Sequence, residues 1–415
     1  MQRKRVVITG MGTVNPMANS VAETWQRVVA GESGIGTITR FDASGLPTQI
    51  AGEVRNFAYA DYFTEDMVKK AKRMDTFCHY GAAALREAWD QAQLDAVADK
   101  RRIGISVGSG VGGLTVQHDN SVTLVTKGPR RVSPFFVPMS IGNIASGVLS
   151  MMYGIKGPNI SLQTACATAN HSMAMAQLII QNGMADVMVA GGAEGTVNEI
   201  SIAGFGNMQA LSTRNDSPET ASRPYDVDRD GFVLSEGSGI LILEEYEHAL
   251  ARGADILAEV LSCGMSGDAY DFVAPDPEGG GAAYSMQMAL EQAGLEAADL
   301  DYINTHGTST PVGDVAEIKG IYSLIKDCAD KVLIGSTKCY HGHLLGATAG
   351  LEAILTVMAL RNGLVPGNKN MLNRDPELPP VQLPVEPVKR ELKIALSNSF
   401  GFGGHNSSLL LAKVL

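Results

Sequence analysis

Short apolar segments bounded by glycine recur along the whole chain and alternate with longer segments of helical periodicity. We interpret as strands residues 5–9, 102–107, 187–190, 239–243, 302–304, 332–335 and 394–397. Residues 83–92 and 284–293 have helical spacing, and Gly294 follows the second segment where a left-handed glycine ends a helix. Buried strands that alternate with helices are typical of α/β proteins, and near-continuous apolar strands favour mainly parallel sheets.

The two halves of the chain each contain a similar helix, which indicates an internal duplication. One helix begins near Cys166 and runs to residues 182–183, and the other begins near His343 and runs to residues 362–363. Both helices are apolar on nearly every face, so both are expected to be buried. We predict one compact body of two related halves, residues 1–252 and 253–415. Cys166 and His343 would lie at equivalent helix starts that face one another.

Composition excludes several classes of protein. The 415 residues are 45% hydrophobic and 19% charged, which suits a large globular core. A net charge of −11 argues against general nucleic-acid binding. Five scattered cysteines do not form a disulfide framework, and no apolar run approaches the roughly 18 residues of a membrane span. We therefore expect a cytoplasmic protein with no membrane span.

Cys166 is the candidate nucleophile. It lies in Ser161-Leu162-Gln163-Thr164-Ala165-Cys166-Ala167-Thr168-Ala169, between a strand-like and a helix-like segment. A helix N-terminus carries partial positive charge and free N–H groups, so it is expected to lower the thiol pKa and to provide an oxyanion donor. A buried structural cysteine is the alternative that these residues alone leave open.

Two histidine motifs lie far downstream, as is usual for the partners of a catalytic cysteine. His306 follows the strand-like residues 302–304, and His343 follows residues 332–336, with Lys338 between them as a fixed cation. Two imidazoles and a lysine beside a thiol suit the stabilisation of negative charge on an oxygen while a carbon nucleophile forms. Cys339 lies close to His343, but its spacing matches no common zinc pattern, and we predict no metal.

Two glycine-rich segments need separate interpretations. Residues 398–406 follow a strand, and we interpret them as a loop whose backbone N–H approaches a substrate oxygen, with Phe402 as a movable gate; a simple tight turn is the alternative. Residues 108–113 have the spacing of a dinucleotide fingerprint. Residues 115–126 are β-branched and polar, so we expect no clear helix after them and no dinucleotide site.

Taken together, the motifs resemble the elongating β-ketoacyl-[acyl carrier protein] synthases of the thiolase superfamily, closest to the type II enzymes of fatty-acid synthesis. The resemblance covers essentially the whole chain. The matching motifs are Val7–Gly12, Thr164–Cys166, Ala190–Glu194, Ala210–Asp216, Arg223–Asp226, Arg229–Val233, His306–Thr310 and Gly342–Ala347. The resemblance implies an α/β protein with a five-layered α/β/α/β/α thiolase-like fold of two duplicated halves, and a homodimer.

The resemblance also implies an acyltransferase reaction. Cys166 would take an acyl group from acyl carrier protein, and malonyl carrier protein would lose carbon dioxide and attack the acyl carbonyl. Kinetics would be ping-pong, and no cofactor would be needed. Cys166, His306 and His343 match the family's catalytic triad, and Lys338 matches its supporting lysine. The amides of Cys166 and Phe402 would form the oxyanion hole.

Further roles follow from the same resemblance. Residues that match substrate contacts are Thr308, Thr310, Phe402, Phe205 and Val111, the last of which would set the depth of the acyl pocket. Glu352 and Asp314 match supporting acids. Two basic groups would dock the acidic carrier, or else are ordinary solvated residues: Lys69, Lys70 and Arg73, with Lys72 beside them, and Lys127, Arg130 and Arg131. The chain departs from the family's common form at Gln209, Asp271, His341 and His405.

Three alternatives to fatty-acid elongation remain at this stage. The same chemistry serves polyketide or other specialised acyl chains. A non-catalytic chain-length factor would lack the active cysteine, which Cys166 argues against. A biosynthetic thiolase would need a second catalytic cysteine near residues 400–406, where this chain has none.

Overall fold

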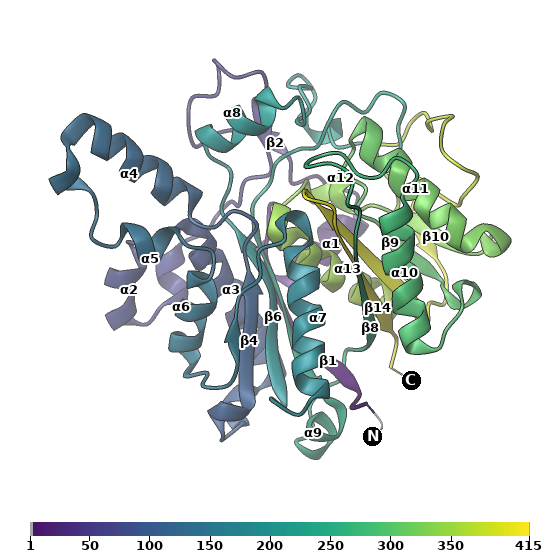
Figure 1. Ribbon diagram of the computed structural model, residues 1–415, viewed down its shortest axis with the longest axis horizontal. Coiled ribbons are helices and arrows are strands. Elements are labelled where there is room, and N and C mark those ends of the chain that lie inside the picture. The colour runs from purple at the N-terminus through teal and green to yellow at the C-terminus, as the bar shows by residue number, and fades with distance from the viewer. Residues whose placement is uncertain (1–2, 415) are drawn as a thin grey trace.

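A computed structural model describes residues 3–414, and a ten-stranded mixed sheet runs through it (Figure 1). The strands are β1 (Val6–Val14), β4 (Ile103–Gly108), β5 (Asn159–Ile160), β6 (Val187–Glu194), β7 (Gly237–Glu245), β8 (Ala258–Gly267), β9 (Tyr302–Asn304), β10 (Leu333–Gly335), β13 (Ile394–Gly401) and β14 (His405–Ala412). Two short ribbons pair β2 (Gly36–Thr37) with β3 (Ile50–Ala51), and β11 (Leu364–Val365) with β12 (Val388–Lys389).

The sheet is built from two halves with the same topology. From the centre outward, the first half has the order β1-β7-β6-β4-β5 and the second has β8-β14-β13-β9-β10. In each half the two inner pairings are antiparallel and the two outer pairings are parallel. β1 and β8 pair with each other and join the halves. The expected duplication and α/β class are therefore confirmed.

Helices cover the sheet on both sides and also separate its halves. α7 (Thr168–Gln181) packs on β4, β6 and β8, and α13 (Thr348–Asn362) packs on β7 and β13, which makes these two helices the central layer. α3 (Thr76–Ala92) and α6 (Ile144–Tyr153) cover the first half. α10 (Gly280–Ala293) and α11 (Pro311–Ile325) cover the second half (Figure 1). The expected five-layered order is the result.

Shorter or peripheral helices complete the chain. They are α1 (Val21–Val29), α2 (Glu65–Ala71), α4 (Leu114–Lys127), α5 (Phe136–Ser140), α8 (Glu199–Asn207), α9 (Tyr246–Ala251) and α12 (Lys338–His341). Within residues 3–414, no helix combines the length and apolar character that crossing a membrane requires.

The two central helices begin in the same way. Ala165 and Leu345 both have a positive φ, of 48° and 46°, and each opens a 3₁₀ turn that leads into its helix. A non-glycine residue in this conformation costs about 1–3 kcal/mol, which the surrounding structure must offset. The repeat makes Cys166 equivalent to Gly346, so His343 precedes the equivalent position by three residues rather than occupying it.

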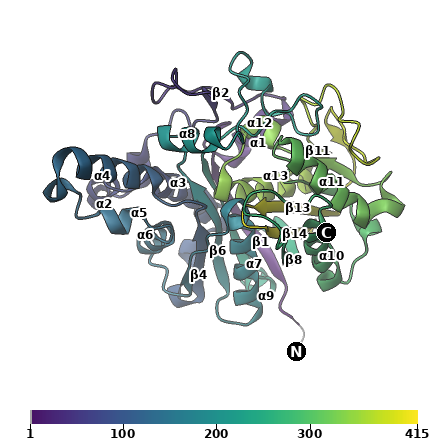
Figure 2. The same ribbon diagram turned by 45° about the horizontal axis from the view of Figure 1, so that its top comes forward.

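Two expectations about local structure were wrong. The sheet is mixed rather than mainly parallel, because strands buried on both faces have the same apolar pattern in either direction. α4 follows the glycine motif at residues 108–113, although its residues have low helix propensity. No residue of α4 is buried, and the helix projects from the body in both views (Figures 1 and 2).

Candidate active site

Cys166 and His343 meet where the two halves of the fold face each other. The Cys166 Sγ lies 3.1 Å from the His343 Nε2, across 177 residues of sequence. The His343 Nδ1 lies 3.0 Å from the Thr348 hydroxyl, in the first turn of α13. When that hydroxyl donates to Nδ1, the ring proton is on Nε2 and points at the sulfur. The expected proximity of the thiol and this imidazole is therefore present.

His306 completes a cluster with these two side chains. Its ring centroid lies 5.2 Å from that of His343, with the planes at 82°, and atoms of Cys166, His306 and His343 all lie within 4.8 Å of one another. His306 follows β9 directly, and Glu317 on α11 accepts its backbone N–H at 2.8 Å. Burial and the charge of Lys338 hold the pKa of both histidines well below the usual value, so both rings are neutral.

Lys338 is a buried cation behind the cluster. Its Nζ donates to the Glu352 Oε1 at 2.6 Å, and both side chains are at most 1% exposed. Burial raises the pKa of Glu352 to about 7, and the contact with Lys338 opposes that rise. The lysine charge reaches all three members of the cluster, lowering the pKa of Cys166, His306 and His343.

The Cys166 thiol differs from the expectation of a lowered pKa. Burial raises its pKa to about 12. Lys338 and the backbone N–H groups of Cys166 and Phe402 act in the opposite direction but do not outweigh the loss of water. The 3₁₀ turn at Ala165 holds the sulfur in an apolar region, and this burial is the physical reason for the difference.

The end of β13 fits closely against the turn that carries Cys166. The Ser399 hydroxyl donates to the Cys166 carbonyl at 2.8 Å. A Cβ at Gly401 would lie 2.7 Å from the Thr164 carbonyl oxygen and 3.1 Å from the Cys166 nitrogen, so only glycine fits there. This close approach brings the Phe402 N–H to the sulfur, where two backbone donors converge. That arrangement can stabilise an oxyanion.

The cluster opens into a cavity of about 490 Å³. All five residues with an expected substrate role line it, together with Cys166, His306 and His343: Val111, Phe205, Thr308, Thr310 and Phe402. The hydroxyls of Thr308 and Thr310 lie 3.1 Å apart. The ring centroids of Phe205 and Phe402 lie 6.4 Å apart, so the lining contains an aromatic pair as well as the two hydroxyls.

Asp314 acts on the backbone of the threonine-rich loop rather than on the cavity. Its Oδ1 accepts from the Ser309 N–H at 3.0 Å, its Oδ2 accepts from the Tyr225 N–H at 2.9 Å, and Arg229 lies 3.6 Å away. Ser309 has a φ of 72°, which these contacts hold in place. The carboxylate therefore fixes the loop that carries Thr308 and Thr310.

The cluster also contains side chains of the types that bind zinc. Cysteine and histidine are zinc ligands, and the three candidate atoms are close enough to share an ion. The charge of Lys338 acts on each of the three, which disfavours a divalent cation among them. The donor set is suited to protons and oxyanions.

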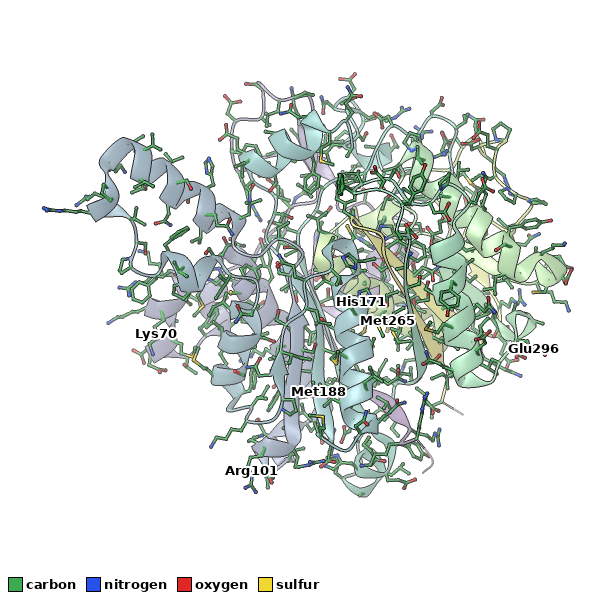
Figure 3. All side chains as sticks on the ribbon, viewed as in Figure 1. Lys70, Arg101, His171, Met188, Met265 and Glu296 are labelled. Atoms are coloured by element: carbon green, nitrogen blue, oxygen red, sulfur yellow. The ribbon has the colours of Figure 1, made fainter. Side chains whose placement is uncertain are left out.

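The six basic residues with an expected docking role are exposed and lie away from the cavity lining. Lys69, Lys70 and Arg73 are on or beside α2, and Arg73 stacks on the Phe135 ring at 4.6 Å. Figure 3 places Lys70 at the edge of the molecule, whereas His171, near the start of α7, is central. Lys127 ends α4, and Arg130 and Arg131 follow it.

The four sequence departures lie in different settings, and one of them, His405, is exposed at the start of β14. Gln209 lines the cavity with a φ of 56°. Asp271 accepts the N–H groups of Val273 and Ala274, and so stabilises its own turn. His341 is fully buried, within 3.1 Å of the Thr337 hydroxyl, and burial lowers its pKa to about 3.

Several residues that hold the site together were not identified from the sequence. They are Glu194, Glu317, Thr348 and Ser399, each of which bonds to a site residue or to its backbone. Glu194 lies in the motif Ala190–Glu194, and Ser399 lies in the glycine-rich segment 398–406. The spacing within these segments does not indicate which residues the two side chains contact. The contacts of Glu194 and Ser399 cross between the halves of the fold, whereas those of Glu317 and Thr348 lie within the second half, 11 and 5 residues from the histidine that each contacts.

Comparison with known protein families gives two adjacent matches. The model described as "Beta-ketoacyl synthase, N-terminal domain" matches residues 3–249. The model described as "Beta-ketoacyl synthase, C-terminal domain" matches residues 257–372. Together they cover most of the chain.

Curated relatives match over the full chain. A 3-oxoacyl-[acyl-carrier-protein] synthase 2 from Vibrio cholerae is 47% identical, over 100% of each chain. One from Staphylococcus aureus strain COL is 46% identical, over 99% of each chain. A solved β-ketoacyl synthase from Burkholderia phymatum STM815 has a TM-score of 0.92 at 32% identity, covering 99% of this chain and 100% of its own. A polyketide ketosynthase solved with its acyl-carrier protein has a TM-score of 0.91 at 28% identity, over 100% of each chain.

Proposed function

Because the chain belongs to the β-ketoacyl synthase family, we propose that Cys166, His306 and His343 are its catalytic residues. The enzyme is an acyltransferase of fatty-acid chain elongation that condenses an acyl thioester with a malonyl thioester and releases carbon dioxide. The single observation that carries the assignment of roles is the 3.1 Å contact between the Cys166 Sγ and the His343 Nε2.

In the first half-reaction, the Cys166 sulfur attacks the acyl thioester. A new S–C bond forms, the carrier thiolate leaves, and the thiol proton is released. The N–H groups of Cys166 and Phe402 favour negative charge at the sulfur, and they become donors to the carbonyl oxygen as charge moves onto it. Burial raises the pKa of the Cys166 thiol to about 12, so these two donors and the charge of Lys338 are what favour the thiolate that attacks.

In the second half-reaction, malonyl thioester loses carbon dioxide and leaves an enolate whose charge lies on the thioester oxygen. His306 and His343 are neutral, so their Nε2–H groups donate to that oxygen without giving up a proton. The enolate carbon attacks the acyl carbonyl and the Cys166 thiolate leaves, to be reprotonated from solvent. Burial and, after it, the charge of Lys338 keep the histidines neutral, and Glu352 accepts a hydrogen bond from the Lys338 Nζ.

The cavity accounts for the rest of the substrate. Thr308 and Thr310 provide hydroxyls for the amide-rich arm of a carrier, and Val111, Phe205 and Phe402 provide an apolar surface for the acyl chain. The exposed basic residues near α2 and α4 suit the acidic surface of an acyl carrier protein, whose complex with a related ketosynthase has been solved.

A homodimer is proposed from the apolar surface of α4 and its neighbours. Val125 is 85% exposed, Met151 is 66% exposed, and Val137 is 63% exposed. A patch of this kind marks an interface, and β5 adds a free sheet edge on the same side of the fold. The five free cysteines suit a reducing cytoplasm.

Sequence identity to proteins of known function favours fatty-acid elongation over polyketide synthesis. The curated 3-oxoacyl synthases are 45–47% identical to the chain, whereas the ketosynthases titled as polyketide or chain-length-factor complexes are 28–31% identical. The test is to incubate the enzyme with two forms of the carrier protein, one loaded with an acyl group and the other with a malonyl group. A 3-oxoacyl product two carbons longer supports the proposal, and release of free acid alone contradicts it.

A further inference from the structure

Glu194, the last residue of β6, is a carboxylate with no exposed surface and, among the ion pairs of residues 3–414, no cationic partner. It accepts four hydrogen bonds instead. The donors are the Ser109 hydroxyl at 2.6 Å and the backbone N–H groups of Gly110, Gly346 and Val111 at 2.7, 2.9 and 3.4 Å. A buried carboxylate is costly unless its oxygens are satisfied, so this set of donors fixes where it can lie.

The donors belong to the two segments that wall the cavity beside the nucleophile. Gly110 and Val111 line the cavity, as does Leu345, which is next to Gly346. Glu194 itself is not part of the lining. Its carboxylate therefore holds together two adjacent lining segments, one from each half of the fold.

The contact leaves no room for adjustment. A Cβ at Gly110 would lie 2.9 Å from the Glu194 Oε2, 3.2 Å from the Gly346 nitrogen and 3.4 Å from the Ala165 carbonyl oxygen. A Cβ at Gly346 would lie 2.8 Å from the same carboxylate oxygen. Neither glycine has a positive φ, so close approach rather than backbone conformation requires them. The carboxylate and the two glycines form one tightly packed unit that touches the turn before Cys166.

We propose that Glu194 is a positioning residue that fixes the Gly110–Val111 wall and thereby sets which acyl lengths Cys166 accepts. The inference rests on the proposed function, because it takes this wall as part of the acyl pocket. Glu194 acts through backbone N–H groups and touches no substrate. Its effect is therefore on the selectivity for the acyl group, and the malonyl half-reaction at His306 and His343 does not depend on it.

The test uses Glu194→Gln in the full-length enzyme. The amide has the same shape, but its NH₂ group cannot accept from the facing N–H groups, so the wall is released. Rates of Cys166 acylation are measured with acyl carrier proteins of graded length. The ratio of long-chain to short-chain rates should change by about tenfold, and decarboxylation of malonyl carrier protein should stay near the wild-type rate.

Glu53→Gln is the matched control. Glu53 is also buried and has no cationic partner among the described residues. It accepts hydrogen bonds from the Thr39 N–H, the Thr39 hydroxyl and the Arg40 N–H, and it is not part of the cavity lining. Glu53→Gln should lower the free energy of unfolding without changing how the rate of Cys166 acylation depends on acyl length, which we call the length profile. A Glu194→Gln profile parallel to wild type, or a uniform loss like that of Glu53→Gln, overturns the proposal.

If Glu194→Gln does not fold, Ser109→Ala decides the question. It removes one donor and leaves the carboxylate and its three amide donors. A shift of the length profile supports the proposal, and an unchanged profile overturns it. Failure of the proposed function is distinguishable, because the wild-type enzyme itself would then take no acyl group on Cys166.

Discussion

The Sγ of Cys166 and the Nε2 of His343 lie 3.1 Å apart although they come from different halves of a duplicated fold. Cys166 lies in the turn that opens α7, His343 lies just before the turn that opens α13, and the two turns pack against each other. Duplication therefore places a thiol from one half opposite an imidazole from the other. The chemistry exists only at the contact between the halves.

Replacement of either histidine by alanine should separate the half-reactions. His306→Ala or His343→Ala removes a neutral donor to the enolate oxygen, so decarboxylation of malonyl carrier protein should fall by about 10²–10³-fold. Acylation of Cys166 should fall less, because its oxyanion donors are backbone groups. His171→Ala is a control with a nearby imidazole outside the cavity lining. Equal losses in both half-reactions would refute the assigned roles.

Replacing only one partner of the buried pair of Lys338 and Glu352 should destabilise the fold more than replacing both partners. Lys338→Met leaves an uncompensated carboxylate and should lower the free energy of unfolding by about 3–5 kcal/mol. Adding Glu352→Leu should recover part of that loss. Lys319→Met, in an exposed pair with Glu278, should cost less than about 1 kcal/mol. Denaturant unfolding gives the free energy of unfolding of all three variants. A Lys338→Met/Glu352→Leu double variant that is less stable than Lys338→Met alone would contradict this account.

His341 should make stability depend on acid pH. The pKa is lowered to about 3 in the folded state by burial and is about 6.5 in the unfolded chain, so between these values the unfolded state binds more protons. Its contribution is therefore present above pH 6.5 and is lost as pH falls. The unfolding free energy of wild type minus that of His341→Thr should fall by about 1.4 kcal/mol per pH unit between about pH 6 and 4. A difference that does not vary with pH would show that the ring is charged or exposed.

Charge reversal should separate carrier docking from chemistry. The triple change of Lys127, Arg130 and Arg131 to Glu should raise KM for carrier-bound substrates by about tenfold and leave KM for short thioester mimics unchanged. Added salt should reduce the difference. Reversal of three exposed lysines on the second half, Lys326, Lys331 and Lys389, is the matched control. An unchanged carrier KM would remove these residues from the docking surface.

Local structure followed from the sequence where hydrophobic period and turn chemistry agreed. Residues 302–304 form β9 with the expected bounds, and α10 ends at Gly294 as its left-handed glycine indicated. α4 was not predicted because its β-branched residues have low helix propensity and because its apolar residues Val122, Leu124 and Val125 are exposed rather than buried on one face. The hydrophobic pattern also did not predict whether neighbouring strands pair in parallel or antiparallel, because strands buried on both faces have the same apolar pattern in either direction.

The residues of the site could be predicted from the sequence, but their burial, their pKa values and the contacts that support them could not. The sequence motifs identified Cys166, His306 and His343, and the fold places them together. The expected lowering of the thiol pKa failed because a helix start predicts positive potential but says nothing of how much water is lost. Supporting contacts such as that of Glu194 with Gly346 join the halves across 152 residues, and no local pattern carries that information.

The most direct test of the central claim is mass spectrometry of the enzyme after incubation with an acyl carrier protein. Peptide mapping should place one acyl group on Cys166, and Cys166→Ala should take none. Cys263→Ala, which alters another buried thiol outside the cavity lining, should be acylated like wild type. An acyl group on a different cysteine, or undiminished acylation of Cys166→Ala, would contradict the account.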